Sequence, residues 1–396
     1  MSFSSLGLHP SLLKAINAQS MIEPTPIQTV AIPAVLQNKD VLGIAKTGSG
    51  KTASYILPIL QCLQGLPASR YREPKVLVLV PTRELADQVQ DVCQLFTASL
   101  AKSLTSVAVY GGVSLNVQMQ TIGKADLVIA TPGRLLELVD KNAVKLSAIT
   151  TLVLDEADKM LDLRFKDEVD RILALLPSQR QNLLFSATLS SDLSLIHEDL
   201  LRNPEVIHIK DDVDRSDTST TEGRDQYGAV HDELIRQLGY FVSEERKGPL
   251  LRYLIKHHDL QQVLVFASST HKVDGIVDKL LKNKIDAAAI HAKKSQQFRR
   301  DMLREFKSGE LRVLVATDLL SRGIDIEYLP CVINYELPRS PKDYIHRIGR
   351  TGRADSPGEA ISLVTPAERQ HFRVIQKKMG KRVAMLHSED INLHGY

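Results

Sequence analysis

The segment VLGIAKTGSGKT, residues 41–52, decides the fold class, because it reads as a buried strand, a glycine-rich loop and the start of a helix. The glycines allow backbone N–H groups to wrap around a phosphate, and the dipole of the following helix adds positive potential. We expect Lys51 to reach the β- and γ-phosphates of a nucleotide and the Thr52 hydroxyl to bind Mg²⁺. The general motif begins with glycine, whereas Ala45 fills that position here. The alternative is a glycine-rich turn with a surface lysine.

A second segment, TLVLDEADKM at residues 151–160, ends an apolar run on three carboxylates, Asp155, Glu156 and Asp158. Carboxylates this close repel one another and are costly to desolvate. Ligands of parallel α/β sheets bind beyond the carboxyl ends of the strands, so the three carboxylates are expected to lie near the phosphate loop. Mg²⁺ on a nucleotide would offset their repulsion. We expect Asp155 to hold the metal, Glu156 to polarise the attacking water, and Asp158 to contact a group that reports the nucleotide state. A solvated acidic helix start is the alternative.

Short apolar strands alternate with helical segments on both sides of these motifs. This pattern predicts a parallel sheet with right-handed crossovers in each half of the chain. In the first half we expect strands at Val41–Ile44, Val76–Val80, Val107–Tyr110, Leu127–Ala130, Leu152–Leu154, Leu183–Phe185 and Val206–Ile209. In the second half we expect them at Val263–Phe266, Ala287–Ile290, Val313–Ala316, Cys331–Tyr335 and Ala360–Val364.

A polar stretch interrupts this alternation. Residues 210–226 contain one apolar residue, Val213, too little to form a core, so we predict a flexible linker. The predicted organisation is a first domain at 1–209, a linker at 210–228, a second domain at 229–380 and a short tail at 381–396. The similar units VLVLVPTRELADQV and VLVFASSTHKVDGIV indicate either duplication of one fold or two generic α/β units.

Composition is typical of a soluble globular protein, with 43% hydrophobic and 24% charged residues and a net charge of +3. This charge permits a polyanionic partner without requiring one. The cysteines, Cys62, Cys93 and Cys331, are scattered, and no apolar run is long enough to span a bilayer. The first residues lack the pattern of a signal peptide, so we expect a cytoplasmic protein.

Taken together, the motifs resemble those of the DEAD-box ATP-dependent RNA helicases of superfamily 2, especially bacterial members with a short N-terminus. The resemblance runs from Phe3 to about Val364, and the motifs occur in the order typical of the family. It implies an α/β protein of two tandem RecA-like domains, each with a parallel sheet flanked by helices. It also implies ATP and Mg²⁺ as ligands, RNA as partner, and RNA-stimulated ATP hydrolysis coupled to local duplex unwinding or remodelling of RNA–protein complexes.

The same resemblance assigns roles to individual residues. ATP binding falls to Phe3, Thr25 and Gln28 of the adenine-reading Q motif, to Ala45, Lys46, Thr47, Gly48, Ser49, Gly50, Lys51 and Thr52, and to Gly323 and Asp325. RNA binding falls to Pro81, Thr82, Arg83, Gly111, Gly112, Thr131, Pro132, Gly133, Arg134, Gln296, Arg299 and Thr317. Coupling of nucleotide to RNA falls to Asp158, Ser186, Ala187 and Thr188. Catalysis falls to Lys51, Asp155, Glu156, His346, Arg350 and Arg353, and metal binding to Thr52 and Asp155.

Elementary chemistry agrees with two of these assignments. The amide of Gln28 suits a bidentate contact to N6 and N7 of adenine. Arg350 and Arg353 are spaced to reach a γ-phosphate held by the first domain, as arginine fingers do. The sequence departs from the family at Ser20 and Met21, which replace a glycine–aromatic pair, at Ala292 and at Arg164, which replace glycines.

Some questions remain open at this level. Residues 369–382 carry six Lys or Arg and no acid, which fits either a solvated basic helix or an auxiliary RNA-contacting surface. A DNA-directed translocase of superfamily 2 and an ATP-timed RNA clamp without productive unwinding are alternative functions. A small-molecule kinase is disfavoured, because it would not need the arginine motif of the second domain. We expect a monomer, with proteins of ribosome assembly or RNA decay as possible partners.

Overall fold

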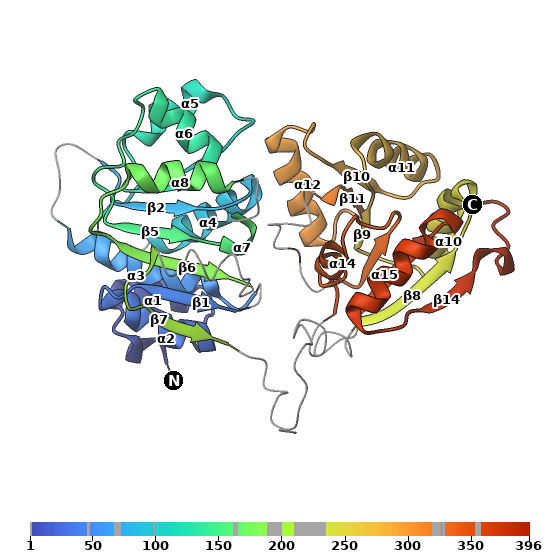
Figure 1. Ribbon diagram of the computed structural model, residues 1–396, viewed down its shortest axis with the longest axis horizontal. Coiled ribbons are helices and arrows are strands. Elements are labelled where there is room, and N and C mark those ends of the chain that lie inside the picture. Colours follow the sequence, from blue (N-terminus) through green and yellow to red (C-terminus); the bar gives the residue numbers. More distant parts are fainter. Residues whose placement is uncertain are drawn as a thin grey trace. The chain divides into compact units, whose positions relative to one another are not determined.

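The computed structural model describes residues 2–45, 48–66, 73–98, 100, 102–160, 165–187, 200–209, 235–318, 326, 329–352 and 358–396, apart from the side chain of Lys342. The chain divides into two compact units, Met1–Lys210 and Asp211–Tyr396 (Figure 1). Each unit contains one parallel seven-stranded sheet with helices packed against it, as the alternation of strands and helices predicted.

The first unit is built on a sheet in the order β3-β4-β2-β5-β6-β1-β7. Its strands are β1 (Val41–Ile44), β2 (Val76–Leu79), β3 (Ser106–Val109), β4 (Leu127–Ala130), β5 (Thr151–Leu154), β6 (Gln181–Ser186) and β7 (Glu205–His208). Its helices are η1 (Phe3–Leu6), α1 (Pro10–Ala18), α2 (Pro26–Leu36), α3 (Lys51–Gly65), α4 (Arg83–Thr97), α5 (Leu115–Ile122), α6 (Pro132–Asp140), α7 (Ala157–Met160) and α8 (Lys166–Leu175).

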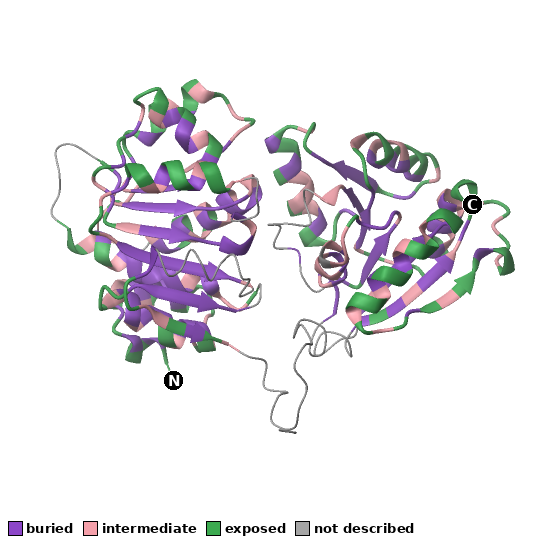
Figure 2. Cartoon of the chain, in the orientation of Figure 1, coloured by how far each residue is buried: buried purple, intermediate pink, exposed green. Residues whose placement is uncertain are grey.

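Both faces of this sheet are buried, which explains why its strands read as continuous apolar runs rather than as alternating patterns. Val153 of β5 packs with helices α1 to α4, whereas its neighbours Leu152 and Leu154 pack on the other face with α6 and α8. Figure 2 shows that most residues of the central strands are buried. Helix α4 begins at the Thr82 cap, with Leu85, Val89 and Phe96 buried on one face.

The second unit repeats this arrangement in the order β10-β11-β9-β12-β13-β8-β14. Its strands are β8 (Ile235–Phe241), β9 (Val263–Phe266), β10 (Ala287–Ile290), β11 (Val313–Ala316), β12 (Cys331–Asn334), β13 (Gly358–Val364) and β14 (Ala384–His387). Its helices are α10 (Glu244–His257), α11 (Thr270–Lys282), α12 (Gln296–Ser308), α14 (Pro341–Ile348), η2 (Pro366–Glu368), α15 (Arg369–Met379) and η3 (Ser388–Asp390). When β8 is counted as the first strand, both sheets have the order 3-4-2-5-6-1-7, as expected for one fold used twice.

Two strands of the second unit differ from the sequence expectation. β8 was not predicted, because Arg236 and Gln237 interrupt its apolar pattern. The last residues, expected to form a tail, place β14 beside β8 in the sheet. Arg246 of α10 holds this segment by donating to the carbonyl oxygens of Ser388 (2.6 Å) and Ile391 (3.0 Å). β14 is mostly exposed although Ala384, Met385 and Leu386 are apolar, because it lies at the edge of the sheet.

Among the helices that the structure describes, none combines the length and the apolar character needed to cross a membrane.

Candidate active site

The phosphate loop lies at the carboxyl end of β1 and begins α3. Gly50 is the N-cap of this helix, with a φ of 88° in the left-handed region. A Cβ at this position would lie 2.5 Å from Nε2 of Gln28, so only glycine fits without a shift. Gln28 itself is 2% exposed, donates to the Gly50 carbonyl oxygen (3.2 Å) and accepts from the Thr25 backbone N–H (3.0 Å). The Q motif therefore packs directly against the phosphate loop.

Other predicted nucleotide residues lie around this contact. Phe3 is buried in the core beneath α2, whereas Gly48 is exposed and Ser49 and Thr52 are half-buried. Ala45 follows β1 and donates its backbone N–H to the carbonyl oxygen of Ser186 (3.1 Å). This bond places the start of the predicted coupling segment beside the phosphate loop. Lys46 and Thr47 lie outside the described residues.

Lys51 and Asp155 form the buried charged centre of the unit. The ammonium of Lys51 donates to the Ala45 carbonyl oxygen at 2.5 Å. Burial lowers the pKa of Lys51, and the nearby charges of Asp155, Glu156 and Asp158 oppose that shift. Burial likewise raises the pKa of Asp155, and the charge of Lys51 opposes the rise. A cation and three carboxylates thus share one desolvated pocket, as the two sequence motifs predicted.

The orientation of Asp155 is fixed by two donors. The Tyr55 hydroxyl of α3 donates to Oδ2 (2.8 Å), and the Glu156 backbone N–H donates to Oδ1 (2.9 Å). Tyr55 is completely buried, so its hydroxyl cannot turn to solvent. The sequence analysis did not single out Tyr55, because nothing in the local pattern of α3 announces a partner one hundred residues away.

Glu156 has an unusual backbone and a half-satisfied side chain. Its φ is 51°, in the left-handed region that non-glycine residues occupy at a cost of about 1–3 kcal/mol. Lys159 pairs with Oε1 at 2.7 Å. The second oxygen, Oε2, is buried and accepts no hydrogen bond from any residue that the structure describes. Strain and an available buried acceptor together are typical of a group that acts on a ligand.

The donor set also fits a hard cation. Mg²⁺ is usually bound by one or two carboxylates together with substrate phosphates, rather than by a cage made of protein alone. Asp155 and the Thr52 hydroxyl supply oxygens of this kind. No group of three or more His, Cys, Asp or Glu capable of holding a metal occurs in the described part of the chain.

The predicted RNA residues of the first unit lie in three loops, which follow β2, β3 and β4. Gly112 has a φ of 86°, and a Cβ there would lie 2.1 Å from Nη1 of Arg83, so the glycine makes room for this guanidinium. Arg134 donates to the Val113 carbonyl oxygen (2.9 Å) and pairs with Glu137 (2.9 Å). Pro81 and Thr82 precede α4, Gly111 follows β3, and Thr131, Pro132 and Gly133 lie at the start of α6.

The predicted coupling residues stand at neighbouring strand ends. Asp158 is 9% exposed on α7, Ser186 ends β6 and is completely buried, and Ala187 is half-buried. Thr188 lies outside the described residues.

In the second unit, Gln296 and Arg299 are buried on the first turn of α12. Arg299 is 2% exposed and donates to Oε1 of Gln296 (3.3 Å), so its guanidinium faces the interior of the unit. Thr317 is half-buried after β11, His346 is half-buried on α14, and Arg350 is 8% exposed. Gly323, Asp325 and Arg353 lie outside the described residues.

Arg347 is the main residue of this region that the sequence analysis missed. It is completely buried, and Nε donates to Asp318 (2.6 Å). Nη1 donates to Asn334 (2.9 Å) and to the carbonyl oxygen of Glu336 (2.7 Å). The helical spacing of Tyr344, Arg347 and Ile348 places all three on the buried face of α14, and this spacing was the available signal.

The chain has two units of one fold, and the first carries a phosphate loop and two carboxylates at the carboxyl ends of its strands. These features define a P-loop nucleotide-binding protein. Family models agree: residues 25–196 match the DEAD/DEAH box helicase model, and residues 246–355 match the helicase conserved C-terminal domain. The ATP-dependent RNA helicase CshA of Listeria monocytogenes is 37% identical over 97% of this chain and 70% of its own length. The DEAD-box ATP-dependent RNA helicase RhpA of Helicobacter pylori is 37% identical over 99% of this chain and 75% of its own.

Solved structures give the same result. Dbp5 of S. cerevisiae bound to RNA and ADP BeF3 has a TM-score of 0.78 and 29% identity, covering 98% of this chain and 96% of that one. A DEAD box protein from Methanococcus jannaschii is 32% identical with a TM-score of 0.52, covering 98% and 99%. The chain therefore belongs to the DEAD-box ATP-dependent RNA helicases, and its two units are tandem RecA-like domains.

Proposed function

We propose that this protein is an ATP-dependent RNA helicase, in which RNA-stimulated ATP hydrolysis drives local, non-processive unwinding of duplexes or remodelling of RNA–protein complexes. The observation that carries the proposal is Glu156, whose strained backbone holds a buried carboxylate oxygen without a partner beside Lys51 and Asp155. A site built only for stability would satisfy that oxygen. Membership of the helicase family supplies the substrate class.

The residues at the carboxyl end of the first sheet take distinct roles in this reaction. Gln28 reads adenine, with Phe3 and Thr25 supporting the Q motif. Lys51 and the loop backbone bind phosphates, while Thr52 and Asp155 hold Mg²⁺, which when bound neutralises phosphate charge. Glu156 orients the attacking water and polarises it by accepting a hydrogen bond from it.

The second domain completes the reaction. Arg350 and Arg353 stabilise charge on the transferred phosphoryl group, and His346, Gly323 and Asp325 support them. Asp158 and the segment from Ser186 to Thr188 couple the nucleotide to RNA. This division makes hydrolysis depend on both domains, so that RNA bound across them can stimulate it.

RNA is bound without sequence preference, through contacts to its backbone. The first domain contributes Pro81, Thr82, Arg83, Gly111, Gly112, Thr131, Pro132 and Gly133, and the second contributes Thr317. Arg134, Gln296 and Arg299 are proposed for the same RNA site, and the hydrogen bonds of the two arginines to protein acceptors hold their side chains in place. Basic residues 369–382, largely exposed on and after α15, are a candidate auxiliary surface.

The protein is proposed to act as a cytoplasmic monomer, with a first domain at 1–209, a linker at 210–228 and a second domain from 229. All three cysteines are free thiols, which suits a reducing compartment. Proteins of ribosome assembly or RNA decay are proposed as its partners.

The test is single-turnover displacement of a labelled RNA strand across a series of duplex lengths, with overhangs of either polarity. Each base-pair step adds about 1.4 kcal/mol for DNA, and RNA is taken to be no weaker. Local separation leaves the remaining pairs to dissociate thermally, so the rate should fall steeply between one helical turn and two. A rate that is flat with length, or strict polarity, would indicate a processive translocase.

Two parallel assays separate the alternatives. ATPase stimulation by single-stranded DNA equal to that by RNA would favour a DNA-directed enzyme. RNA-stimulated ATPase without any strand release would favour an ATP-timed clamp.

A further inference from the structure

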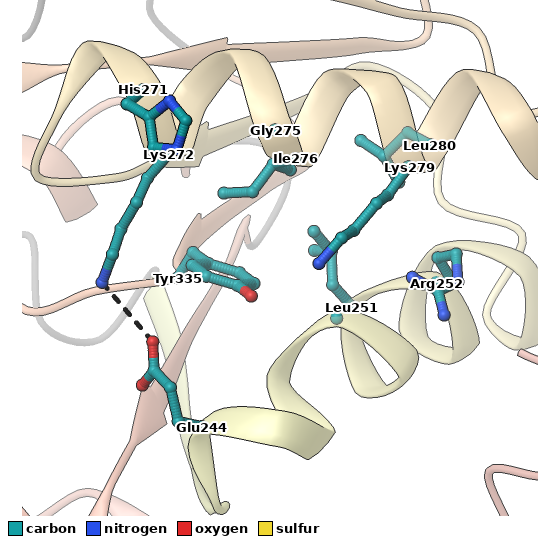
Figure 3. Close-up of a pocket in the computed structure, with 11 residues that line it drawn as sticks. Glu244, Leu251, Arg252, His271, Lys272, Gly275, Ile276, Lys279, Leu280 and Tyr335 are labelled. Atoms are coloured by element: carbon teal, nitrogen blue, oxygen red, sulfur yellow. Dashed lines mark hydrogen bonds and ion pairs between the residues drawn. The ribbon is translucent and has the colours of Figure 1, made fainter.

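A groove separates helices α10 and α11 in the second domain (Figure 3). Its volume is about 280 Å³. It is lined by Glu244, Gly248, Leu251 and Arg252 of α10, by His271, Lys272, Gly275, Ile276, Lys279 and Leu280 of α11, and by Tyr335 after β12. None of these residues belongs to the predicted ATP or RNA sites, so the groove has no role in the function proposed above.

Gly275 keeps this groove open. It lies inside α11, where glycine is the poorest helix former after proline. No atom lies within 4 Å of the position that a Cβ would occupy, and its φ is not positive. Packing therefore does not require a glycine there, and alanine would favour the helix. Gly248 is less informative, because it precedes Pro249, which already restricts the chain.

Charge is distributed unevenly along the groove. At one end, Lys272 pairs with Glu244 (3.4 Å) and with Glu336, so its charge is compensated. At the other end lie Arg252 and Lys279, as Figure 3 shows. No described residue forms an ion pair with either cation, and Nε of Arg252 is buried without a hydrogen-bond partner among the described residues. This end of the groove offers two donors to an anion.

Between the two ends the groove is apolar. Leu251 is 1% exposed, Leu280 is completely buried, and Ile276 is 7% exposed. The phenol of Tyr335 lies among them, and burial together with the charge of Glu244 raises its pKa to about 12, so it stays a neutral donor. A floor of three aliphatic side chains beside one phenol suits a large apolar side chain.

The volume of the groove is also compatible with an apolar side chain as its occupant. Sites for whole small molecules enclose about 300–1,000 Å³. A cavity of about 280 Å³ lies at the small end of this range and has room for one large side chain with its neighbours outside. An anion next to this side chain would meet Arg252 and Lys279.

We propose that the groove between α10 and α11 docks a peptide segment of a partner protein, in which a large apolar side chain is adjacent to an Asp or Glu. The apolar side chain enters between Leu251 and Ile276. The carboxylate pairs with Arg252 and Lys279.

The test is selection of a display library of short random peptides on the full-length protein, followed by affinity measurements on synthetic copies of the enriched peptides. Two variants alter the groove. Gly275→Leu fills it, and Lys279→Glu reverses the charge at its cationic end. Lys282→Glu is the matched control, because Lys282 is exposed on the same helix but does not line the groove. Thermal melting and RNA-stimulated ATPase establish that each variant is folded and active.

The expected result is enrichment of peptides that combine an acid with a large apolar residue. Their dissociation constants should rise about tenfold or more on Lys279→Glu and on Gly275→Leu, and should be unchanged on Lys282→Glu. Peptides that bind all variants equally, peptides without this pattern, or no enrichment would overturn the proposal. The proposal would also be overturned if Lys279→Glu lowered the affinity for a labelled single-stranded RNA as much as the affinity for the peptides. The groove would then be an RNA-binding surface.

Discussion

Glu156 in the first domain and Glu336 in the second occupy the same place in one repeated fold. Each is the second residue after the fifth strand of its domain, β5 or β12. Each is 8% exposed and pairs with a lysine, Lys159 or Lys272. What surrounds the two carboxylates is nevertheless different, and this difference separates a reacting group from a structural one.

Glu336 is fully satisfied. One oxygen is held by Lys272, and the other accepts the Ser268 backbone N–H (2.7 Å) and hydroxyl (2.5 Å). Burial alone would raise the pKa of Glu336, but the hydrogen bonds from Lys272 and Ser268 outweigh it and lower the pKa. Glu156 keeps one buried oxygen without a described partner and holds a left-handed backbone. The second domain thus uses this position to hold loops together, whereas in the first domain the oxygen without a described partner suits the proposed role of Glu156 toward water.

The sharpest test of this comparison is Glu156→Gln beside Glu336→Gln. Loss of a positioned general base costs about 10²–10⁴ in rate, so Glu156→Gln should bind ATP and RNA but hydrolyse slowly. It should accumulate a complex with both ATP and RNA bound, because we expect this complex to need the γ-phosphate rather than its cleavage. Glu336→Gln should be less stable but should keep most of its turnover per folded molecule. Phosphate release under saturating RNA measures both, and equal losses in the two variants would remove the distinction.

A second test contrasts two buried tyrosines. The Tyr55 hydroxyl donates to Asp155, whereas that of Tyr344 in the second domain contacts the Ser362 hydroxyl (3.0 Å). Tyr55→Phe removes a group that orients a proposed metal ligand, and such groups are worth about 10–100-fold in metal affinity or activity. The Mg²⁺ concentration for half-maximal ATPase should rise accordingly. Tyr344→Phe should lower the melting temperature and leave the Mg²⁺ requirement unchanged; a rise there would mean that general loosening explains both.

The third test concerns the base, and its control is a glutamine in the same domain. Guanine carries O6 where adenine has the N6 donor, and a bidentate amide contact is worth about 1–3 kcal/mol of discrimination. Gln28→Ala should therefore reduce the preference for ATP over GTP by roughly one to two decades. Gln181→Ala removes another buried amide, which donates to Val35 and Lys39, and should cost stability only. An unchanged ATP/GTP ratio in Gln28→Ala would place adenine recognition elsewhere.

The sequence predicted what local patterns encode. Every strand expected from a continuous apolar run overlaps a strand of the structure, because parallel strands buried on both faces must be apolar throughout. The phosphate loop and Asp155 were predicted to lie close together, because both follow the carboxyl ends of strands in one parallel sheet. In the structure the charge of Asp155 acts on Lys51 and raises its pKa against the effect of burial. Strands β8 and β14 were not predicted. Arg236 and Gln237 interrupt the apolar pattern of β8, and β14 lies at the edge of its sheet, where it is mostly exposed.

The contacts that complete the site could not be predicted, because they join distant segments. Tyr55 meets Asp155 across 100 residues, and Lys272 meets Glu336 across 64. Arg347 is different, because its helical spacing with Tyr344 and Ile348 indicates the buried face of α14, but its partners Asp318 and Asn334 come from other segments. Pairings of this kind depend on the order of strands, which a single sequence leaves open.

At low pH, Glu336 should no longer contribute to the free energy of unfolding. Its pKa in the folded protein lies below the ordinary 4.5, so its stabilisation is present above about pH 4.5 and is lost as the pH falls through the lower native value. Glu336→Gln should therefore destabilise the second domain by about 1.5–3 kcal/mol at neutral pH. The gap from wild type should close on acidification. Denaturant unfolding of both proteins across this range measures the gap, and a gap that persists below the native pKa would assign the effect to packing.

The smallest effect concerns helix ends. Ser20 lies two residues after the end of α1 and has a φ of 55°. The backbone N–H groups of Ser20 and Met21 donate to the carbonyl oxygens of Asn17 and Ile16. Glycine usually occupies this position after a helix. In the second domain, Gly309 directly follows α12 and also has a left-handed backbone, with a φ of 81°. No atom of the described residues lies within 4 Å of an added Cβ there. Ser20→Gly should therefore stabilise the first domain by about 0.5–1 kcal/mol, and Gly309→Ser should destabilise the second by a similar amount. For domains of this size that corresponds to roughly 1–4 °C in melting temperature. Ala18→Gly, at the last residue of α1, is the control and should lower stability, because its backbone is helical. If Ser20→Gly also lowered stability, its side chain would be making a contact worth more than the backbone strain.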